Sequence, residues 1–187
     1  MQVAKTLNNG SFMRGRTGWI RRRIENPESI YEHSCKVGLV AYYLFGTDEA
    51  IAKGIVHDFG EIYEPDYIPW EVNSDDKREK EFAVMKRLKD LLPNGDFLYN
   101  HWVEFENKIG IGVQINELDK MCPSIQAINY VSQYPNNNLE EFQPYAMTRV
   151  LTPELGDLLS QFNIGRQTSK DAYQEYFNLL KKINISK

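Results

Sequence analysis

The sequence predicts an all-α fold, a helical bundle that takes in residues 1–187 as a single domain. Three observations predict it: apolar residues recur at helical spacing over most of the chain, turns containing Pro or Gly separate these segments, and no segment shows a convincing strand pattern. A chain of 187 residues with 42% hydrophobic and 26% charged residues can bury one core of ordinary size.

The first predicted helix covers residues 26–44. Asn26 is a suitable N-cap, the proline after it favours the first helical position, and Gly46 is expected to end the helix. A second helix begins after Asp48 and is expected to continue through residues 57–61. A loop rich in proline and aromatic residues follows it.

Three more helices are predicted in the middle of the chain, at residues 74–92, 97–107 and 112–130. The first opens with serine and two aspartates, which are common at helix N-termini, and a Pro-Asn-Gly turn ends it. The segment 135–138 is expected to be a loop, because a proline and three asparagines disfavour regular structure.

Two or three C-terminal helices are expected over about residues 138–185, including one at 170–183. The chemically informative motifs all fall earlier, within about residues 16–130. The sequence therefore predicts a motif-bearing helical core followed by helices without a recognisable motif.

Several protein classes are disfavoured by composition. No apolar run approaches the roughly 20 residues of a membrane span, and the N-terminal segment lacks the apolar core of a signal peptide, so we expect a cytoplasmic protein with no membrane partner. Cys35 and Cys122 are too few for a disulfide framework, and we interpret both as small core residues. The net charge of −4 argues against tight binding of a nucleic-acid polymer.

Four residues with metal-binding side chains stand out: His33, His57, Asp58 and Asp119. This mixed nitrogen and oxygen donor set suits Mn²⁺, Fe²⁺, Co²⁺ or Mg²⁺. His57 and Asp58 lie about 100° apart around a helix axis, and the other two come from separate helices, so all four could face the core of a bundle. Taken singly, each has a plainer interpretation, as a hydrogen-bonded core histidine or a solvated aspartate.

Four short segments resemble one branch of the HD-domain phosphohydrolases, the 5′-deoxynucleotidases and their relatives. They are residues 16–19 (RTGW), 26–34 (NPESIYEHS), 55–62 (IVHDFGEI) and 117–120 (ELDK), in family order. The resemblance implies an HD-domain helical bundle in which the two histidines and two aspartates hold a divalent metal in the core. Mn²⁺, Co²⁺, Fe²⁺, Mg²⁺ and Zn²⁺ are the candidate metals.

The same resemblance implies roles for two further carboxylates. Glu61 would act as the catalytic acid or base, although a glutamate at a helix end is often only an exposed residue. Asp66 would help to orient water or phosphate. The loop around it departs from the Gly-Asp of relatives, so Glu64 is an alternative.

Substrate-binding residues are expected mainly in the N-terminal segment. Relatives place an arginine and a tryptophan of this segment at the nucleotide, which implies Arg16 or Arg22 at the phosphate and Trp19 at the sugar and base. The plainer interpretations are a solvated basic face and an ordinary core aromatic residue. Three more basic residues could reach additional phosphates: Lys77, Arg78 and Lys120.

The expected function is metal-dependent hydrolysis of deoxynucleotides, most simply 5′-dephosphorylation of deoxynucleoside monophosphates by metal-activated water. The alternative is a dNTP triphosphohydrolase that converts dATP and releases tripolyphosphate, like the compact enzymes that phages encode. A short spacing between His33 and His57 suits that alternative. A catalytically silent nucleotide sensor is the third hypothesis, against which the intact ligand set argues. The partners expected are a small nucleotide and, from the resemblance, further copies of the chain in a homodimer or higher homo-oligomer.

Overall fold

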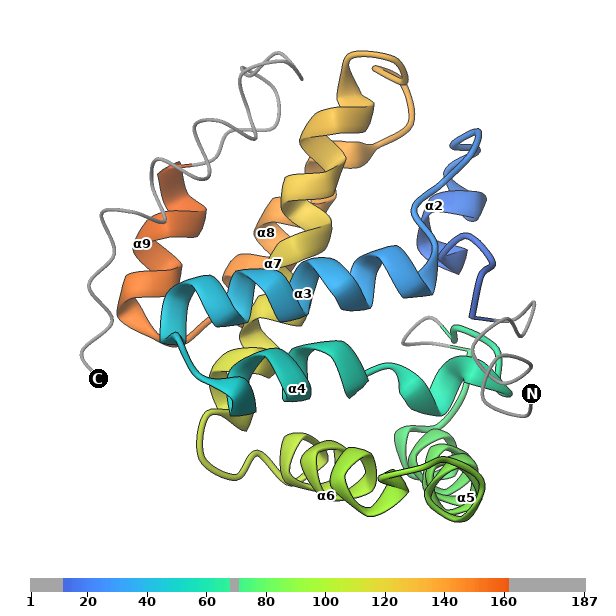
Figure 1. Cartoon of the computed structure of the whole chain (residues 1–187). Coiled ribbons are helices and arrows are strands. Elements are labelled where there is room, and N and C mark those ends of the chain that lie inside the picture. The colour runs from blue at the N-terminus through green and yellow to red at the C-terminus, as the bar shows by residue number, and fades with distance from the viewer. Residues whose placement is uncertain (1–11, 68–70, 162–187) are drawn as a thin grey trace.

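The computed structural model describes residues 12–67 and 71–161 (Figure 1). Within these ranges the structure is helical, and its β-type pairing is an isolated bridge between Gly15 and Ser29. The elements, in chain order, are α2 (Thr17–Arg21), α3 (Ile30–Phe45), α4 (Asp48–Val56), η1 (Phe59–Ile62), α5 (Ser74–Leu91), α6 (Gly95–Glu106), α7 (Gly112–Val131), η2 (Leu139–Glu141), α8 (Phe142–Met147) and α9 (Pro153–Gln161). The all-α prediction is confirmed. None of the described helices combines the length and the apolar character needed to cross a membrane.

Helix α3 begins later than the sequence predicts. Ser29, not Asn26, is the N-cap: its hydroxyl accepts from the backbone N–H of Glu32, whose carboxylate accepts from the backbone N–H of Ser29. Asn26 has a φ of 50°, in the left-handed region, and so precedes the helix as a turn residue. Gly46 ends α3 as predicted, with a φ of 64° that glycine adopts without steric cost.

Helices α3 and α4 approach each other through two glycines. A Cβ added to Gly54 on α4 would lie 2.6 Å from the Cα of Gly38 on α3. A Cβ added to Gly38 would lie 2.6 Å from a side-chain carbon of Ile55. The missing side chains therefore let the two backbones pack closely, which fixes His33 on α3 relative to His57 at the end of α4.

The second helix is shorter than the sequence predicts. Helix α4 ends at Val56, His57 is its C-cap, and Asp58 leads into the 3₁₀ helix η1, which carries Glu61. The backbone N–H of Glu61 donates to the carbonyl oxygen of Asp58 at 2.9 Å, so Glu61 stays within one turn of the pair. The following helix begins at Ser74 as predicted, with Asn73 capping the N–H of Asp75.

Buried apolar side chains form two clusters. One joins α3, α7, α8 and α9 and includes Trp19, and the other joins the end of α4 with η1, α5 and α6 and includes Trp102. Figure 1 shows α3 above α4, with α7 crossing α3 and with α5 and α6 together below α4. The site described below lies where α3, α4 and α7 meet.

The remaining described helices agree with the predictions, with the exception of α2. Helices α6 and α7 match the predicted segments to within two residues, and residues 135–138 lie in a turn region between α7 and η2. Helices α8 and α9 confirm that the C-terminal part is helical as far as Gln161. The helix predicted at 170–183 lies outside the described residues. Helix α2 was not predicted.

Candidate metal centre

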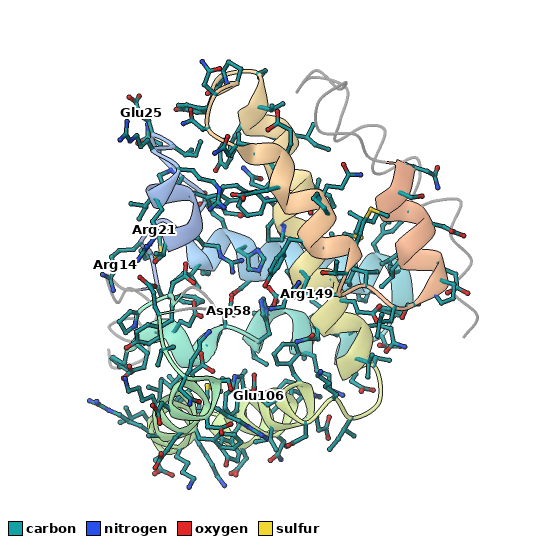
Figure 2. All side chains as sticks on the ribbon, turned by 180° about the vertical axis from the view of Figure 1, so that it is seen from behind. Arg14, Arg21, Glu25, Asp58, Glu106 and Arg149 are labelled. Carbon is teal, nitrogen blue, oxygen red and sulfur yellow. The ribbon has the colours of Figure 1, made fainter. Side chains whose placement is uncertain are left out.

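The two predicted histidines and two predicted aspartates converge. His33 comes from α3, His57 and Asp58 follow α4, and Asp119 comes from α7; one ligand atom from each lies within 4.8 Å of the others. The Nε2 atom of His57 is 3.2 Å from Oδ2 of Asp58 and 3.4 Å from Oδ1 of Asp119. Figure 2 shows Asp58 near the centre of the molecule. The four residues therefore form one compact donor set.

Hydrogen bonds orient His57 toward this set. Its Nδ1 lies 2.7 Å from the carbonyl oxygen of Gly54, a contact that requires Nδ1 to carry the proton and leaves Nε2 directed at the aspartates. The indole N–H of Trp102 donates to the carbonyl oxygen of His57 at 3.2 Å. Both contacts fix the residue that joins α4 to η1, so the imidazole is preorganised as a ligand.

The donor set fits a divalent cation. Nε2 of His57 and Oδ2 of Asp58 are buried, and neither has a hydrogen-bond partner of normal geometry among the described residues. Buried polar atoms without a partner are costly, and a cation bound between them would satisfy both. Imidazole nitrogens and carboxylate oxygens suit the harder and borderline divalent metals better than a soft ion.

The electrostatics of the cluster keep its carboxylates ionised. Burial alone would raise the pKa of Asp119, but Lys120 and the two histidines hold it well below its usual range. Burial alone would lower the pKa of His57, but the Asp58 carboxylate and Asp119 raise it to about 10. For His33, burial and the Arg16 guanidinium prevail and lower the pKa. In the metal-free site a proton therefore resides on His57.

Glu28 is a buried glutamate next to this site, and the sequence analysis assigned it no role. Glu28 accepts from the Trp19 indole N–H at 3.4 Å and from the Lys36 ammonium at 2.6 Å, and one of its oxygens lies 4.0 Å from Nδ1 of His33. Burial would raise the pKa of Glu28, but His33, Lys36 and Arg16 lower it. Its charge therefore faces the ring nitrogen of His33 that does not point at the aspartates.

Glu61 lies beside the donor set as predicted but is not a surface residue. It is 2% exposed, and its Oε1 accepts from the Lys77 ammonium at 3.0 Å. Its Oε2 is buried without a hydrogen-bond partner in the described part of the chain. Burial and the nearby Asp58 charge raise the pKa of Glu61 well above its usual range, with Lys77 opposing them.

A pocket of about 440 Å³ opens over these residues. Its charged side is formed by Asp58, Glu61 and Asp119, with cationic side chains around them. Aromatic side chains in its lining include Trp19 from α2 and Phe142 and Tyr145 from α8. The basic and aromatic side chains of the lining include Arg16, Trp19, Arg22, Lys77, Lys120, Phe142 and Tyr145.

The first predicted substrate residues lie in this pocket. Arg16 lines it, and its Nε lies 4.0 Å from the Asp66 carboxylate, which also accepts from the backbone N–H of Thr17 at 2.6 Å. Asp66 therefore lines the pocket, whereas Glu64 is not among the described lining residues. Trp19 lines it too, although it is 2% exposed.

The other basic residues divide between the pocket and the surface. Arg22 lines the pocket, pairs with Glu141 and lies 4.5 Å above the Phe142 ring. The ammonium of Lys120, also in the lining, is 2.5 Å from Oδ2 of Asp119. Arg78 instead donates to Asn107 at 2.8 Å and is not among the described lining residues.

Several residues of the site were missed by sequence reasoning. Phe142 and Tyr145 belong to α8, where no motif marks them. Glu81 lies one helical turn after Lys77, a spacing that predicts an ion pair and could have identified it. Glu28 lies in the motif segment 26–34, but the motif assigned no role to this residue. His101 is not one of the four clustered residues and packs against Phe97, with ring centroids 4.3 Å apart.

Comparisons with known proteins agree with the fold and show the family. Residues 13–157 match the HD domain family. The chain is 30% identical over 155 residues to the frog Xenopus laevis protein 5′-deoxynucleotidase HDDC2, covering 78% of this chain and 77% of that one. It is 26% identical over 163 residues to the human protein of the same name, covering 82% and 80%. A conserved hypothetical protein from Pyrococcus furiosus superimposes with a TM-score of 0.63 at 24% identity, over 97% of this chain and 99% of that one, which shows a shared fold.

Proposed function

The chain belongs to the HD-domain family, and from this premise we propose that it is a divalent-metal-dependent phosphohydrolase that removes the 5′-phosphate of deoxynucleoside monophosphates. One observation carries the proposal: Asp58 and Asp119 of the four-residue cluster line a pocket that also takes aromatic side chains from α2 and α8. A nucleotide combines the two matching groups, a phosphate and a flat base. The names of the frog and human relatives support the substrate class.

The two histidines and two aspartates would hold the cation. When bound, it supplies Lewis acidity that polarises a phosphoryl oxygen and lowers the pKa of water. The donor set supports Mn²⁺, Fe²⁺ or Co²⁺ as the metal, because imidazole and carboxylate together suit these ions. His57 must lose the proton it carries in the metal-free site before its Nε2 can bind a cation.

Glu61 would manage the protons of the reaction. Hydrolysis forms a bond between a water oxygen and phosphorus, breaks the bond from phosphorus to the 5′ oxygen, and moves a proton from the water to the departing alkoxide. Glu61 lines the pocket, and its Oε2 is buried without a hydrogen-bond partner among the described residues. The raised pKa of this carboxyl makes it a stronger base than an exposed glutamate.

The phosphate and the nucleoside would bind on different walls. Arg16 offers a buried Nη1 that has no hydrogen-bond partner among the described residues, and Lys120 and Lys77 add charge around the same space. The aromatic residues Trp19 and Phe142, whose ring centroids lie 4.3 Å apart, supply the apolar surface for sugar and base. Arg22 would lie at this second wall, since its guanidinium covers Phe142.

The proposal is tested by identifying products. The purified protein is incubated with Mn²⁺ or Co²⁺ and a panel of ribo- and deoxynucleoside mono- and triphosphates, and the products are analysed by mass spectrometry. Nucleoside and orthophosphate from the deoxynucleoside monophosphates are expected. Release of tripolyphosphate from dATP would show instead that the protein is a dNTP triphosphohydrolase. If no substrate is turned over although metal is bound, the hypothesis of a catalytically silent nucleotide sensor is favoured.

Two further expectations remain predictions. A cytoplasmic setting is one of them, since both cysteines are free thiols, as is usual for proteins of that reducing compartment. The other is the homodimer or higher homo-oligomer expected from the family resemblance. Light scattering on the protein as it elutes from a size-exclusion column tests it.

A further inference from the structure

One lysine joins a buried carboxylate and a partly buried one at the edge of the metal centre. The ammonium of Lys77 lies 3.0 Å from Oε1 of Glu61 and 3.3 Å from Oε1 of Glu81. Lys77 and Glu81 are four residues apart on α5, so they share one face of that helix. The side chains of Glu61 and Glu81 are 2% and 12% exposed, so the contacts differ from the solvated ion pairs of a protein surface.

The backbone brings these groups together. Helix α5 packs against η1, and a Cβ added to Gly60 would lie 2.7 Å from the Cβ and the Cγ of Glu81. Gly60 directly precedes Glu61. The first side-chain carbons of Glu81 therefore pack against Gly60, the residue before Glu61, in space that a side chain at Gly60 would fill.

The lysine determines how Glu61 can be oriented. It occupies Oε1, while Oε2 stays buried without a hydrogen-bond partner within the described ranges. An ammonium has three N–H donors, so two carboxylate contacts leave one donor for a phosphate oxygen. Lys77 lines the pocket, whereas Glu81 is not among the described lining residues.

We propose that Lys77 and Glu81 are positioning residues for the proposed reaction: Glu81 fixes the Lys77 ammonium, which in turn holds Glu61 with Oε2 directed at the reacting phosphate. The role rests on the proposed function, since it assumes that Glu61 handles the proton. Glu81 acts entirely through Lys77, because its carboxylate touches the ammonium and lies outside the pocket lining.

The charges of the three groups agree with this arrangement. Burial alone would lower the pKa of Lys77, but Glu61 and Glu81 raise it, so the ammonium stays charged. Burial raises the pKa of Glu81 to about 7 although Lys77 opposes it. Without the Lys77 ammonium, the carboxylates of Glu61 and Glu81 would lie near each other with no cation between them. Their repulsion would favour protonation of one of the two.

The first test separates positioning from phosphate binding by steady-state kinetics on a deoxynucleoside monophosphate with Mn²⁺. For Glu81→Gln we expect kcat to fall about 10- to 100-fold. KM should stay within about twofold, as for a residue that does not touch the substrate. Lys77→Arg should restore much of the kcat that Lys77→Met loses. Lys86→Met is the matched control, because Lys86 is an exposed lysine on the same helix.

A double-variant cycle gives a second criterion. If Glu81 acts through Lys77, the variant carrying both Glu81→Gln and Lys77→Met has the kcat of Lys77→Met alone. Independent losses that multiply would overturn the proposal. Thermal unfolding and Mn²⁺ titration calorimetry of each variant check that the fold and the metal affinity are retained, and Lys77→Met supplies the comparison should Glu81→Gln fail to fold.

A third readout needs neither metal nor turnover. In metal-free protein, a lysine ammonium held by two carboxylates exchanges its protons slowly, so we expect a ¹H–¹⁵N ammonium signal for Lys77 that is absent in Lys77→Arg. Glu81→Gln should broaden or remove it. An active wild type with an unchanged Glu81→Gln kcat and an unchanged signal would overturn the positioning role alone, whereas an inactive wild type would overturn the proposed function.

Discussion

The Nε2 atom of His33 lies 2.9 Å from Oδ1 of Asp119, although the two residues are 86 positions apart in the chain. The contact joins α3 to α7, and both atoms belong to the proposed ligand set. Packing of these two helices therefore decides whether the metal centre exists. It also places Lys120, the neighbour of Asp119, at the pocket.

Metal binding should depend on pH through His57. Its pKa in the metal-free fold is about 10 because the Asp58 charge outweighs the effect of burial, which alone would lower it. A bound cation must displace this proton, so the observed Kd for Mn²⁺ should fall by about tenfold for each pH unit from 6 to 8. Calorimetric titrations in buffers of different ionisation enthalpy would show the released proton. A Kd that is the same at pH 6 and pH 8 would contradict the assignment.

The same proton contributes to the stability of the metal-free protein. The folded pKa of His57 is raised above the usual 6.5 of an unfolded chain, so protonation stabilises the fold. This contribution is fully present below pH 6.5 and is lost as the pH rises through about 10. In His57→Ala the loss of stability between pH 7 and pH 10 should be smaller, as measured by urea unfolding.

Glu61→Gln should retain the metal and lose turnover. The amide keeps the size of the carboxyl and a hydrogen-bonding group near Lys77, but it cannot take or give the proton. We expect kcat to fall by about 10²- to 10⁴-fold with little change in Mn²⁺ affinity. Glu64→Gln is the control, since Glu64 is not among the described pocket residues. Equal kcat values for Glu61→Gln and wild type would reassign the acid or base.

We expect Trp19 to contribute to the stability of the fold, whatever it contributes to substrate selectivity. Its ring packs against Phe142 and Tyr130, and its N–H donates to Glu28. Trp19→Ala should lower the free energy of unfolding by about 3–5 kcal/mol, because it empties a buried site. Trp19→Phe keeps an aromatic ring and loses the hydrogen bond to Glu28, so a loss nearer 1–3 kcal/mol is expected, about the cost of leaving a buried acceptor partly unsatisfied. Denaturant unfolding of the two variants measures both values, and equal stabilities would refute this ordering.

The close contact of α3 with α4 can be tested at a glycine. In Gly54→Ala the new methyl would meet the Gly38 backbone at 2.6 Å, which should cost about 1–3 kcal/mol and displace His57. Gly156→Ala is the matched control on α9, because an added Cβ there has nothing within 4 Å, and the helix should gain up to about 1 kcal/mol. Thermal unfolding distinguishes them: destabilisation of both, or of neither, would argue against the packing explanation.

The candidate ligand set was predictable from the sequence because residue type and motif order point to its four residues without knowledge of packing. His33, His57, Asp58 and Asp119 meet as expected. The start of α3 was mispredicted because Asn26 and the proline after it were given more weight than Ser29. The capping box of Ser29 with Glu32, three residues later, is a spacing that the sequence itself displays.

Other parts of the site depend on tertiary packing that no local pattern reports. Helix α8 brings Phe142 to the pocket only because it folds back on α7. Lys77 was expected at a phosphate, yet its ammonium contacts two carboxylates, because η1 packs against α5 at Gly60. Arg78, one residue later, lies on another face of the same helix and donates to Asn107.

The most direct measurement compares metal content and orthophosphate release from a deoxynucleoside 5′-monophosphate for wild type, Asp119→Asn and Asp157→Asn. Asp157 is an exposed aspartate on α9 and serves as the control. The account predicts metal-dependent release by wild type and Asp157→Asn, and for Asp119→Asn a helical protein with Mn²⁺ affinity weakened by about 100-fold or more and no release at micromolar metal. Release by Asp119→Asn at the wild-type rate, or by wild type after complete removal of divalent metal, would contradict it.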